Sequence, residues 1–264
     1  MNERELLHAA NANFLASFRK LAEHSATGAV REVGGVFAFA SGHPVPLFNG
    51  CLVPDAASPA ELGEALHWVR EHHVPYRVWI AESLVTELGG ILLQAGLELH
   101  HVPYPSMVLH PVPEPPPPAA NVTVAEVGRD QLVDTAGGLG FSHELAEAVF
   151  SPSFASDPDV RLFTGGLDGR PAGYSIAIRS GGMSGVYAVG VARGARRRGV
   201  GTALTWAAVD AGRGWDCEAV TLQSSEMALG MYGAMGFRTV LRYADFREPV
   251  SPTGHETPVP PSPQ

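Results

Sequence analysis

The sequence is poor in cysteine, in charged residues and in long apolar runs, and each shortage excludes a class of protein. Its 264 residues include two cysteines, Cys51 and Cys217, which match no metal-ligand spacing and are interpreted as reduced thiols of a cytosolic protein. Lysine and arginine number 18 against 27 aspartates and glutamates, so the net charge of −9 disfavours a protein that binds nucleic acid through a basic surface. No apolar run approaches the length of a membrane span.

The N-terminus also lacks the features of an export signal. Residues 1–21 mix Glu3, Arg4 and Glu5 into a helical apolar pattern, without a basic start that is followed by a continuous apolar core. The expectation is a soluble cytoplasmic protein that binds neither nucleic acid nor a membrane. A monomer and a homodimer are both compatible with the sequence.

Two pairs of adjacent histidines, His72-His73 and His100-His101, do not indicate a metal site. Adjacent residues of a strand point to opposite faces, and the sequence contains no obvious third ligand. No metal is therefore expected.

Proline-rich stretches divide the chain. Residues 111–118 read Pro-Val-Pro-Glu-Pro-Pro-Pro-Pro, which favours extended polyproline II geometry. Such a segment could bind a proline-recognising domain, but a semi-rigid spacer is the simpler interpretation. Apolar residues make up 45% of the chain, enough to bury a core. The predicted organisation is a domain at 1–110, a linker at 111–120, a second domain at 121–248 and a disordered tail at 249–264.

Apolar periodicity predicts alternating strands and helices in both domains. The predicted helices are 5–22, 59–72, 84–94, 129–150, 203–211 and 227–235. The predicted strands are 30–39, 46–52, 76–81, 107–109, 122–127, 161–166, 173–179, 185–191, 219–223 and 243–247. Ser58, Pro59 and Glu61 have the spacing of a capping box, and Asp168-Gly169 is a hairpin turn signal. Together they predict an α/β fold with a mixed, mostly antiparallel central sheet flanked by helices.

The most informative stretch is 189–202, Val-Gly-Val-Ala-Arg-Gly-Ala-Arg-Arg-Arg-Gly-Val-Gly-Thr. It reads as a strand, a basic turn and the start of a helix. The first N–H groups of a helix have no intrahelical partner, and with the positive end of the helix dipole they bind phosphate. Gly199 and Gly201 would let the backbone approach a pyrophosphate closely, and Arg196–Arg198 add positive charge.

The ends of the two domains look alike. Residues 92–97, Leu-Leu-Gln-Ala-Gly-Leu, can be laid over residues 232–237, Tyr-Gly-Ala-Met-Gly-Phe, and a β-rich segment follows each. This short match indicates two related folds, of which only the second has the basic glycine turn.

In these residues the chain resembles the GNAT superfamily of acetyl-CoA-dependent N-acetyltransferases. The Gln/Arg-x-x-Gly-x-Gly/Ala signature of that family is matched by Arg196, Gly199 and Gly201. A helix that carries a tyrosine and ends in Gly-Phe is matched by Tyr232, Gly236 and Phe237. The resemblance covers about 122–247. It implies a GNAT fold, and by architecture the first domain resembles the degenerate half of tandem members.

The resemblance also implies residue roles. The strand before the turn would pair with the pantetheine arm of acetyl-CoA, and Gly190 would suit the bulge that opens the cofactor slot. The turn amides would hold the pyrophosphate, and Ser225 stands where an asparagine often contacts the cofactor. The residues to which cofactor contacts are assigned are Val189, Gly190, Val191, Arg196, Arg197, Arg198, Gly199, Val200, Gly201, Thr202 and Ser225.

Tyr232 matches the general acid of the family, so the implied reaction is direct attack of a primary amine on the thioester of acetyl-CoA. A phenol with a pKa of about 10 can protonate a departing thiolate whose conjugate acid has a pKa of about 8.5. A backbone N–H near Gly190 or Val191 would meet the oxyanion. Four residues are alternatives for the base, besides a chain of water molecules: Glu126, His143, Glu144 and Glu226.

Other interpretations stay open at this point. The arginine run could be a solvated turn, and Tyr232 could be a packing residue. The missing base allows an alternative function, a non-catalytic acyl-CoA-binding or regulatory module. Leu92 stands where Tyr232 stands in the second domain, so the first domain is expected not to bind acetyl-CoA productively.

Overall fold

The computed structural model describes residues 1–249, without the side chains of residues 101–103. The chain forms two compact units, each discontinuous in sequence. We call residues 1–17 and 106–240 the C-terminal unit, and residues 18–105 with 241–249 the N-terminal unit. The predicted disordered tail, 249–264, lies outside the described residues apart from Pro249.

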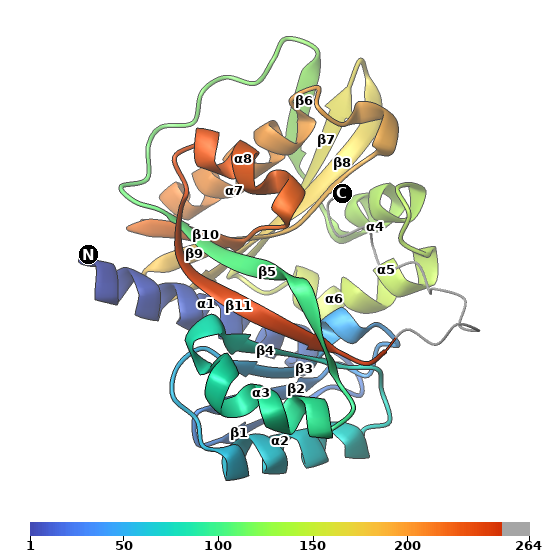
Figure 1. Ribbon diagram of the computed structural model, residues 1–264. Coiled ribbons are helices and arrows are strands. Elements are labelled where there is room, and N and C mark those ends of the chain that lie inside the picture. The colour runs from blue at the N-terminus through green and yellow to red at the C-terminus, as the bar shows by residue number, and fades with distance from the viewer. Residues whose placement is uncertain (250–264) are drawn as a thin grey trace. The chain divides into compact units, whose positions relative to one another are not determined.

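The C-terminal unit contains the site and most of the helices labelled in Figure 1. Its complete elements are β6 (Val122–Glu126), α4 (Arg129–Gly138), α5 (His143–Val149), α6 (Pro152–Ala155), β7 (Val160–Leu167), β8 (Arg170–Ser180), β9 (Met183–Val191), η3 (Arg193–Ala195), α7 (Val200–Gly214), β10 (Ala219–Gln223) and α8 (Glu226–Ala234). Parts of three further elements join them, namely α1 (Glu3–Glu23), β5 (Glu98–Leu109) and β11 (Arg238–Arg247).

The sheet of this unit runs in the order β5-β10-β9-β8-β7-β6. β9 and β10 are parallel because the crossover helix α7 connects them, and the other pairs with an assigned register are antiparallel. Leu204 of α7 and Val220 of β10 are fully buried in the core on one face. On the other face, Leu6 and Ala10 of α1 pack against Val108.

The N-terminal unit repeats this plan with fewer elements. They are β1 (Ala29–Val33), β2 (Val36–Ala40), η1 (Pro46–Phe48), β3 (Asn49–Val53), α2 (Pro59–Glu71), β4 (Arg77–Ala81), η2 (Glu82–Leu84) and α3 (Val85–Gln94). The strand order is β1-β2-β3-β4-β11, and α2 connects the parallel pair β3 and β4. Each unit therefore has a mixed, mostly antiparallel sheet with flanking helices, which confirms the predicted fold class.

The internal repeat extends well beyond the predicted hexapeptides. In both units three antiparallel strands lead into a crossover helix, a parallel strand and a further helix. Those last helices end alike: the N–H of Leu97 donates to the carbonyl of Leu92, and the N–H of Phe237 donates to that of Tyr232, both at 3.0 Å. Gly96 supplies the positive φ that such an ending requires, as Gly236 does in the C-terminal unit.

The final strand of each half of the chain lies in the sheet of the other half. β5 follows α3, yet residues 106–109 pair with β10. β11 follows α8, yet residues 243–247 pair with β4. The compact units therefore differ from the contiguous domains 1–110 and 121–248 predicted above. The proline-rich segment 111–120 begins and ends within the C-terminal unit.

Several predicted elements have different extents. The predicted strand 46–52 begins as the 3-10 helix η1 and continues as β3, and the predicted strand 107–109 is the end of the longer strand β5. Two others contain a break that the pattern does not show. The predicted strand 30–39 is a hairpin, because Gly34 adopts a φ of +54° and turns the chain between β1 and β2. The predicted helix 129–150 ends first at Gly138, and Ser142 caps the new helix α5.

Two local predictions are confirmed. The side chain of Ser58 accepts from the N–H of Glu61, whose carboxylate accepts from the N–H of Ser58, so the capping box of α2 is complete. Asp168 and Gly169 both have positive φ and form the turn between β7 and β8.

Asn13 fastens α1 to the sheet of the C-terminal unit. Its side chain is fully buried, and its Nδ2 donates to the carbonyls of Ile178 and Met183 at 3.0 and 3.2 Å. Its Oδ1 accepts from the hydroxyl of Tyr187 at 2.7 Å. Two buried hydrogen bonds and one part-buried hydrogen bond therefore depend on one amide.

Replacing Asn13 with leucine is expected to lower the free energy of unfolding by about 2–4 kcal/mol. The change removes one donor from each of two carbonyls in a buried environment and removes the acceptor of the Tyr187 hydroxyl. Urea unfolding measures the effect. Asn121→Leu is the control at an exposed asparagine, for which a change within about 0.5 kcal/mol is expected. Equal stability of the two variants would contradict the role of Asn13.

Candidate functional site

The turn before α7 presents a row of unpaired amides. Gly199 has a φ of +87° and precedes the first residue of the helix. The first helical bond joins the N–H of Ala203 to the carbonyl of Gly199 at 2.9 Å. Within residues 1–249, the backbone N–H groups of residues 197–202 donate to no protein acceptor. They lie at the positive end of a helix dipole, which favours a bound anion.

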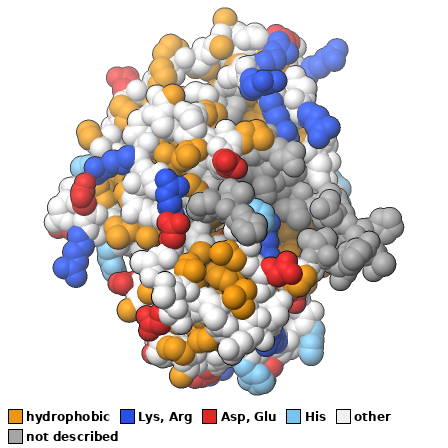
Figure 2. All heavy atoms as spheres, viewed as in Figure 1, with side chains coloured by type: hydrophobic (Ala, Val, Ile, Leu, Met, Phe, Trp, Pro, Cys, Tyr) orange, Lys and Arg blue, Asp and Glu red, His pale blue; other side chains and the backbone are white. Residues whose placement is uncertain are grey.

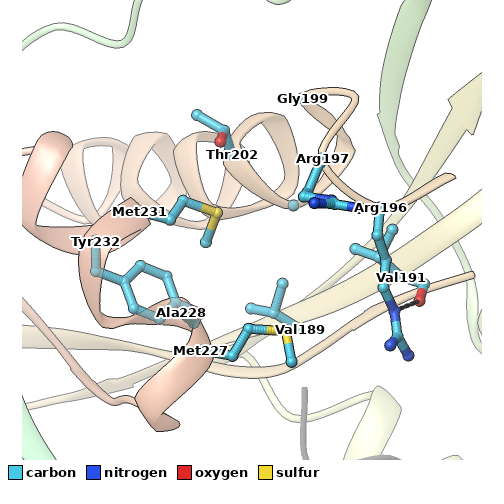
Figure 3. A pocket seen from close by; sticks show the side chains of 11 residues that line it. Val189, Val191, Arg196, Arg197, Gly199, Thr202, Met227, Ala228, Met231 and Tyr232 are labelled. Atoms are coloured by element: carbon cyan, nitrogen blue, oxygen red, sulfur yellow. Dashed lines mark hydrogen bonds between the residues drawn. The ribbon is translucent and has the colours of Figure 1, made fainter. Parts of the chain in front are cut away.

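A pocket of about 330 Å³ lies beside this turn. Its lining residues come from β9, from the turn and first residues of α7, and from α8; they are Val189, Val191, Arg196, Arg197, Gly199, Gly201, Thr202, Met227, Ala228, Met231 and Tyr232. In Figure 3 Met231 and Tyr232 lie on the left of the space, and Met227 lies beside Val189 below it. Arg197 lies by the start of α7, and Arg196 lies beside Val191 on the right. Eight of these eleven residues belong to the predicted site.

A β-bulge determines which residues of β9 face the pocket. Tyr174 pairs with Gly190 and Ile176 pairs with Tyr187, so β9 has one extra residue in this interval. Within this interval Ala188 has a positive φ of +52°. Gly190 pairs with Tyr174 and is not the extra residue, so the prediction that Gly190 forms the bulge is wrong. Glycine is required at position 190 for a different reason: a Cβ there would lie 2.6 Å from ring atoms of Tyr174.

The arginines of the turn differ in their partners. Arg196 and Arg197 line the pocket, and the Nε of Arg196 donates to the carbonyl of Val191 at 3.3 Å. Arg198 does not line it and forms an ion pair with Asp168 at 2.7 Å. Hydrogen bonds from Asn121 and then Arg198 lower the pKa of the Asp168 carboxyl. Figure 2 shows basic side chains gathered at this part of the surface.

Three other predicted residues do not line the pocket. Val200 is buried in the core beneath α7. Gly190 faces Tyr174. Ser225 caps α8, where its hydroxyl accepts from the N–H of Ala228 at 3.4 Å.

Tyr232 forms part of the α8 wall of the pocket. Its side chain is 4% exposed, and its ring meets that of Phe237 edge-on with 5.9 Å between centroids. The turn of the chain at Gly236, just after α8, brings Phe237 back toward Tyr232. The sequence motif of tyrosine and Gly-Phe thus marks one packed unit at the pocket.

Residues 131–237 match the model of the acetyltransferase (GNAT) family. This segment is a GNAT domain. The whole chain is similar in fold to solved GNAT proteins. A GCN5-related N-acetyltransferase from Kribbella flavida has 18% identity and a TM-score of 0.66, with 93% of this chain and 96% of that chain covered. A tandem GNAT protein from the clavulanic acid biosynthesis pathway has 15% identity and a TM-score of 0.59, with 95% and 97% covered.

A third structure, a putative acetyltransferase of the GNAT family from Novosphingobium aromaticivorans, has 16% identity and a TM-score of 0.54, with 92% and 97% covered. At these identities the likeness shows the fold. Comparison with curated protein sequences gives no match.

Sequence reasoning missed three residues of the GNAT pocket: Met227, Ala228 and Met231. They share a face of α8 with Tyr232, at a spacing of one and four residues along the helix. That stripe is visible in the sequence. Met227 is 62% exposed, and its place in a pocket wall accounts for such a large apolar side chain at the surface.

The four residues named for the base lie outside the pocket lining of the GNAT domain. Glu126 forms an ion pair with Arg161 at 2.7 Å, and His143 lies 3.7 Å from Glu147 one helical turn later. Glu144 and Glu226 are exposed. None of the lining residues is acidic or a histidine.

None of the described helices combines the length and apolarity needed to cross a membrane. Among the described residues, no cluster of three or more His, Cys, Asp or Glu side chains is placed to hold a metal ion.

Proposed function

We propose that the protein transfers an acetyl group from acetyl-CoA to a primary amine. The observation that carries the proposal is the row of unpaired amides at 197–202 beside a pocket with apolar walls. Amides at a helix N-terminus suit a pyrophosphate, and the apolar walls suit an extended pantetheine arm. Gly201 fits the same purpose, because a Cβ there would lie 3.5 Å from Val191 and 3.6 Å from the sulfur of Met231, on the inner face of the pocket.

The chain's own residues take distinct parts in this reaction. The turn amides and Arg197 hold the donor phosphates, and the backbone of β9 from Val189 to Val191 holds the donor arm. The acceptor nitrogen bonds to the acetyl carbon, the carbon–sulfur bond breaks, and Tyr232 donates a proton to the departing thiolate. The nitrogen releases its extra proton to a chain of water molecules, from which the Tyr232 phenolate is protonated again. A backbone N–H near the bulge meets the carbonyl oxygen.

The N-terminal unit is proposed not to bind acetyl-CoA. Its crossover helix α2 begins with a capping box, so side chains of its own residues Ser58 and Glu61 occupy the amides that α7 leaves open. Leu92 also stands at the position of Tyr232. The first amides of α7 are therefore available to an external anion, whereas those of α2 are engaged by its own capping box.

A second candidate function is a non-catalytic acyl-CoA-binding module. It is supported by the lack of an acidic or histidine side chain among the pocket-lining residues. A cytoplasmic location is also proposed, and two free, buried cysteines support it.

Incubation with acetyl-CoA and a panel of primary amines tests the proposal. Thiol release that depends on the amine, with the acetylated amine detected by mass spectrometry, is the expected result. Tight acetyl-CoA binding by calorimetry without turnover on any amine would support the binding module instead.

A further inference from the structure

β9 and β10 part where the sheet meets the pocket. Their pairing ends at Thr221 opposite Gly185, whereas the pairing of β10 with β5 continues to Gln223 opposite Ser106. Gln223 thus lies two residues, about 6.6 Å, beyond the last residue of β10 that pairs with β9. Beyond Thr221, β10 therefore has no assigned pairing with β9.

Gln223 points to the face of the sheet opposite α7 and α8. Val220 and Leu222 belong to the core beneath these helices, and side chains alternate along a strand. The donor pocket is lined from the α7 and α8 side. An acceptor that approaches a thioester held there from the opposite face of the sheet would pass the end of β10 that carries Gln223.

The side-chain carbonyl of Gln223 is an unexplained buried group. Its Oε1 is fully buried and, within the described chain, has no hydrogen-bond partner. Its Nε2 donates to the hydroxyl of Ser106 at 3.5 Å, which orients the amide. Buried carbonyls are almost always paired, so an unpaired one at the end of the strand that leads into α8, a wall of the pocket, indicates a missing ligand.

Comparison of the two repeated units supports a functional role for the unpaired carbonyl of Gln223. The strand equivalent to β10 is β4, which has the same length and ends at Ala81 where β10 ends at Gln223. The N-terminal unit thus lacks a polar group at this position, as it lacks the tyrosine of α8 and the open turn amides.

We infer that Gln223 binds the acceptor amine: its side-chain carbonyl accepts a hydrogen bond from the amine N–H and directs the nitrogen lone pair toward the acetyl carbon. The inference rests on the proposed function. A neutral amide fits an uncharged amine, which is the form with a free lone pair for attack. The acceptor is therefore a primary amine, and its nitrogen must be unprotonated when it attacks the acetyl carbon.

The test compares two substitutions of similar volume. Gln223→Met removes the acceptor oxygen, and the KM for the amine is expected to rise at least tenfold while the dissociation constant for acetyl-CoA stays within twofold. Gln223→Glu keeps acceptor oxygens, so its amine KM is expected within threefold of the unsubstituted protein. Benzylamine, ethanolamine and glycinamide are the probes, and Gln94→Met is the control at an exposed glutamine of α3.

The outcomes separate this inference from the proposed function. A packing role predicts the opposite order, with methionine tolerated and buried glutamate harmful, and that order would overturn the inference alone. Bound acetyl-CoA without transfer to any probe by the unsubstituted protein overturns the transferase function and the inference together.

Discussion

Gly201→Glu is expected to weaken acetyl-CoA binding by at least 100-fold. A side chain at this position grows from the first turn of α7 into the pocket, between Val191 and Met231. It would place a carboxylate among the amides proposed to hold the pyrophosphate. Two like charges 4 Å apart repel by about 4 kcal/mol at an effective dielectric constant of 20, and about 1.4 kcal/mol corresponds to a tenfold change in affinity. Calorimetry with acetyl-CoA measures the loss.

A matched control lies on the same helix. Gly214, near the end of α7, is exposed, and a Cβ there would meet no other atom within 4 Å, so Gly214→Glu adds the same charge away from the pocket. Its acetyl-CoA affinity is expected within twofold of the original. Gly201→Ala separates bulk from charge, because its Cβ makes only ordinary contacts. If Gly201→Glu bound acetyl-CoA with full affinity, the proposal that this turn holds the pyrophosphate would be wrong.

Tyr232→Phe is expected to lower kcat by about 100-fold with little change in the affinity for acetyl-CoA. The substitution keeps the ring, its contact with Phe237 and the α8 wall of the pocket, and removes only the hydroxyl. A positioned general acid contributes about 100-fold or more to a rate. Steady-state kinetics with a saturating amine measure the change.

The control for this variant is another buried tyrosine. Tyr76 in the N-terminal unit is 3% exposed, and its hydroxyl accepts from the Nε of Arg70 at 2.9 Å. Tyr76→Phe is expected to cost about 1 kcal/mol of stability and to leave kcat unchanged. If Tyr232→Phe behaves like Tyr76→Phe, the tyrosine is a packing residue and the proton reaches the thiolate by another route.

Local features of the sequence predicted the turn before α7 and most of the residues that line the pocket. Gly199 needs a positive φ, and the helix that follows it leaves its first amides open; both follow from residue types within one turn. The capping box at Ser58 is local in the same sense. The Gly-Phe end of α8 was readable for the same reason, and with it the place of Tyr232.

Non-local pairing decided the rest. The bulge lies at Ala188, not Gly190, because its position depends on how β9 aligns with β8 and on the ring of Tyr174. The final strand of each half joins the sheet of the other half because β5 pairs with β10 and β11 pairs with β4, and both pairings join segments far apart in the sequence. A domain predicted from sequence is one continuous segment of the chain. Each compact unit of the structure is instead assembled from segments that lie far apart in the sequence.

The sequence by itself determined that a helix with open amides follows a basic turn, since backbone torsion and capping depend on neighbouring residues. Only the tertiary structure brought Met227 and Met231 into one pocket with Val189 and left the side-chain carbonyl of Gln223 buried without a partner in the described chain. The physical reason is the same in both cases: the walls of a pocket and the pairing of a buried polar atom are set by elements that meet only after the sheet has formed.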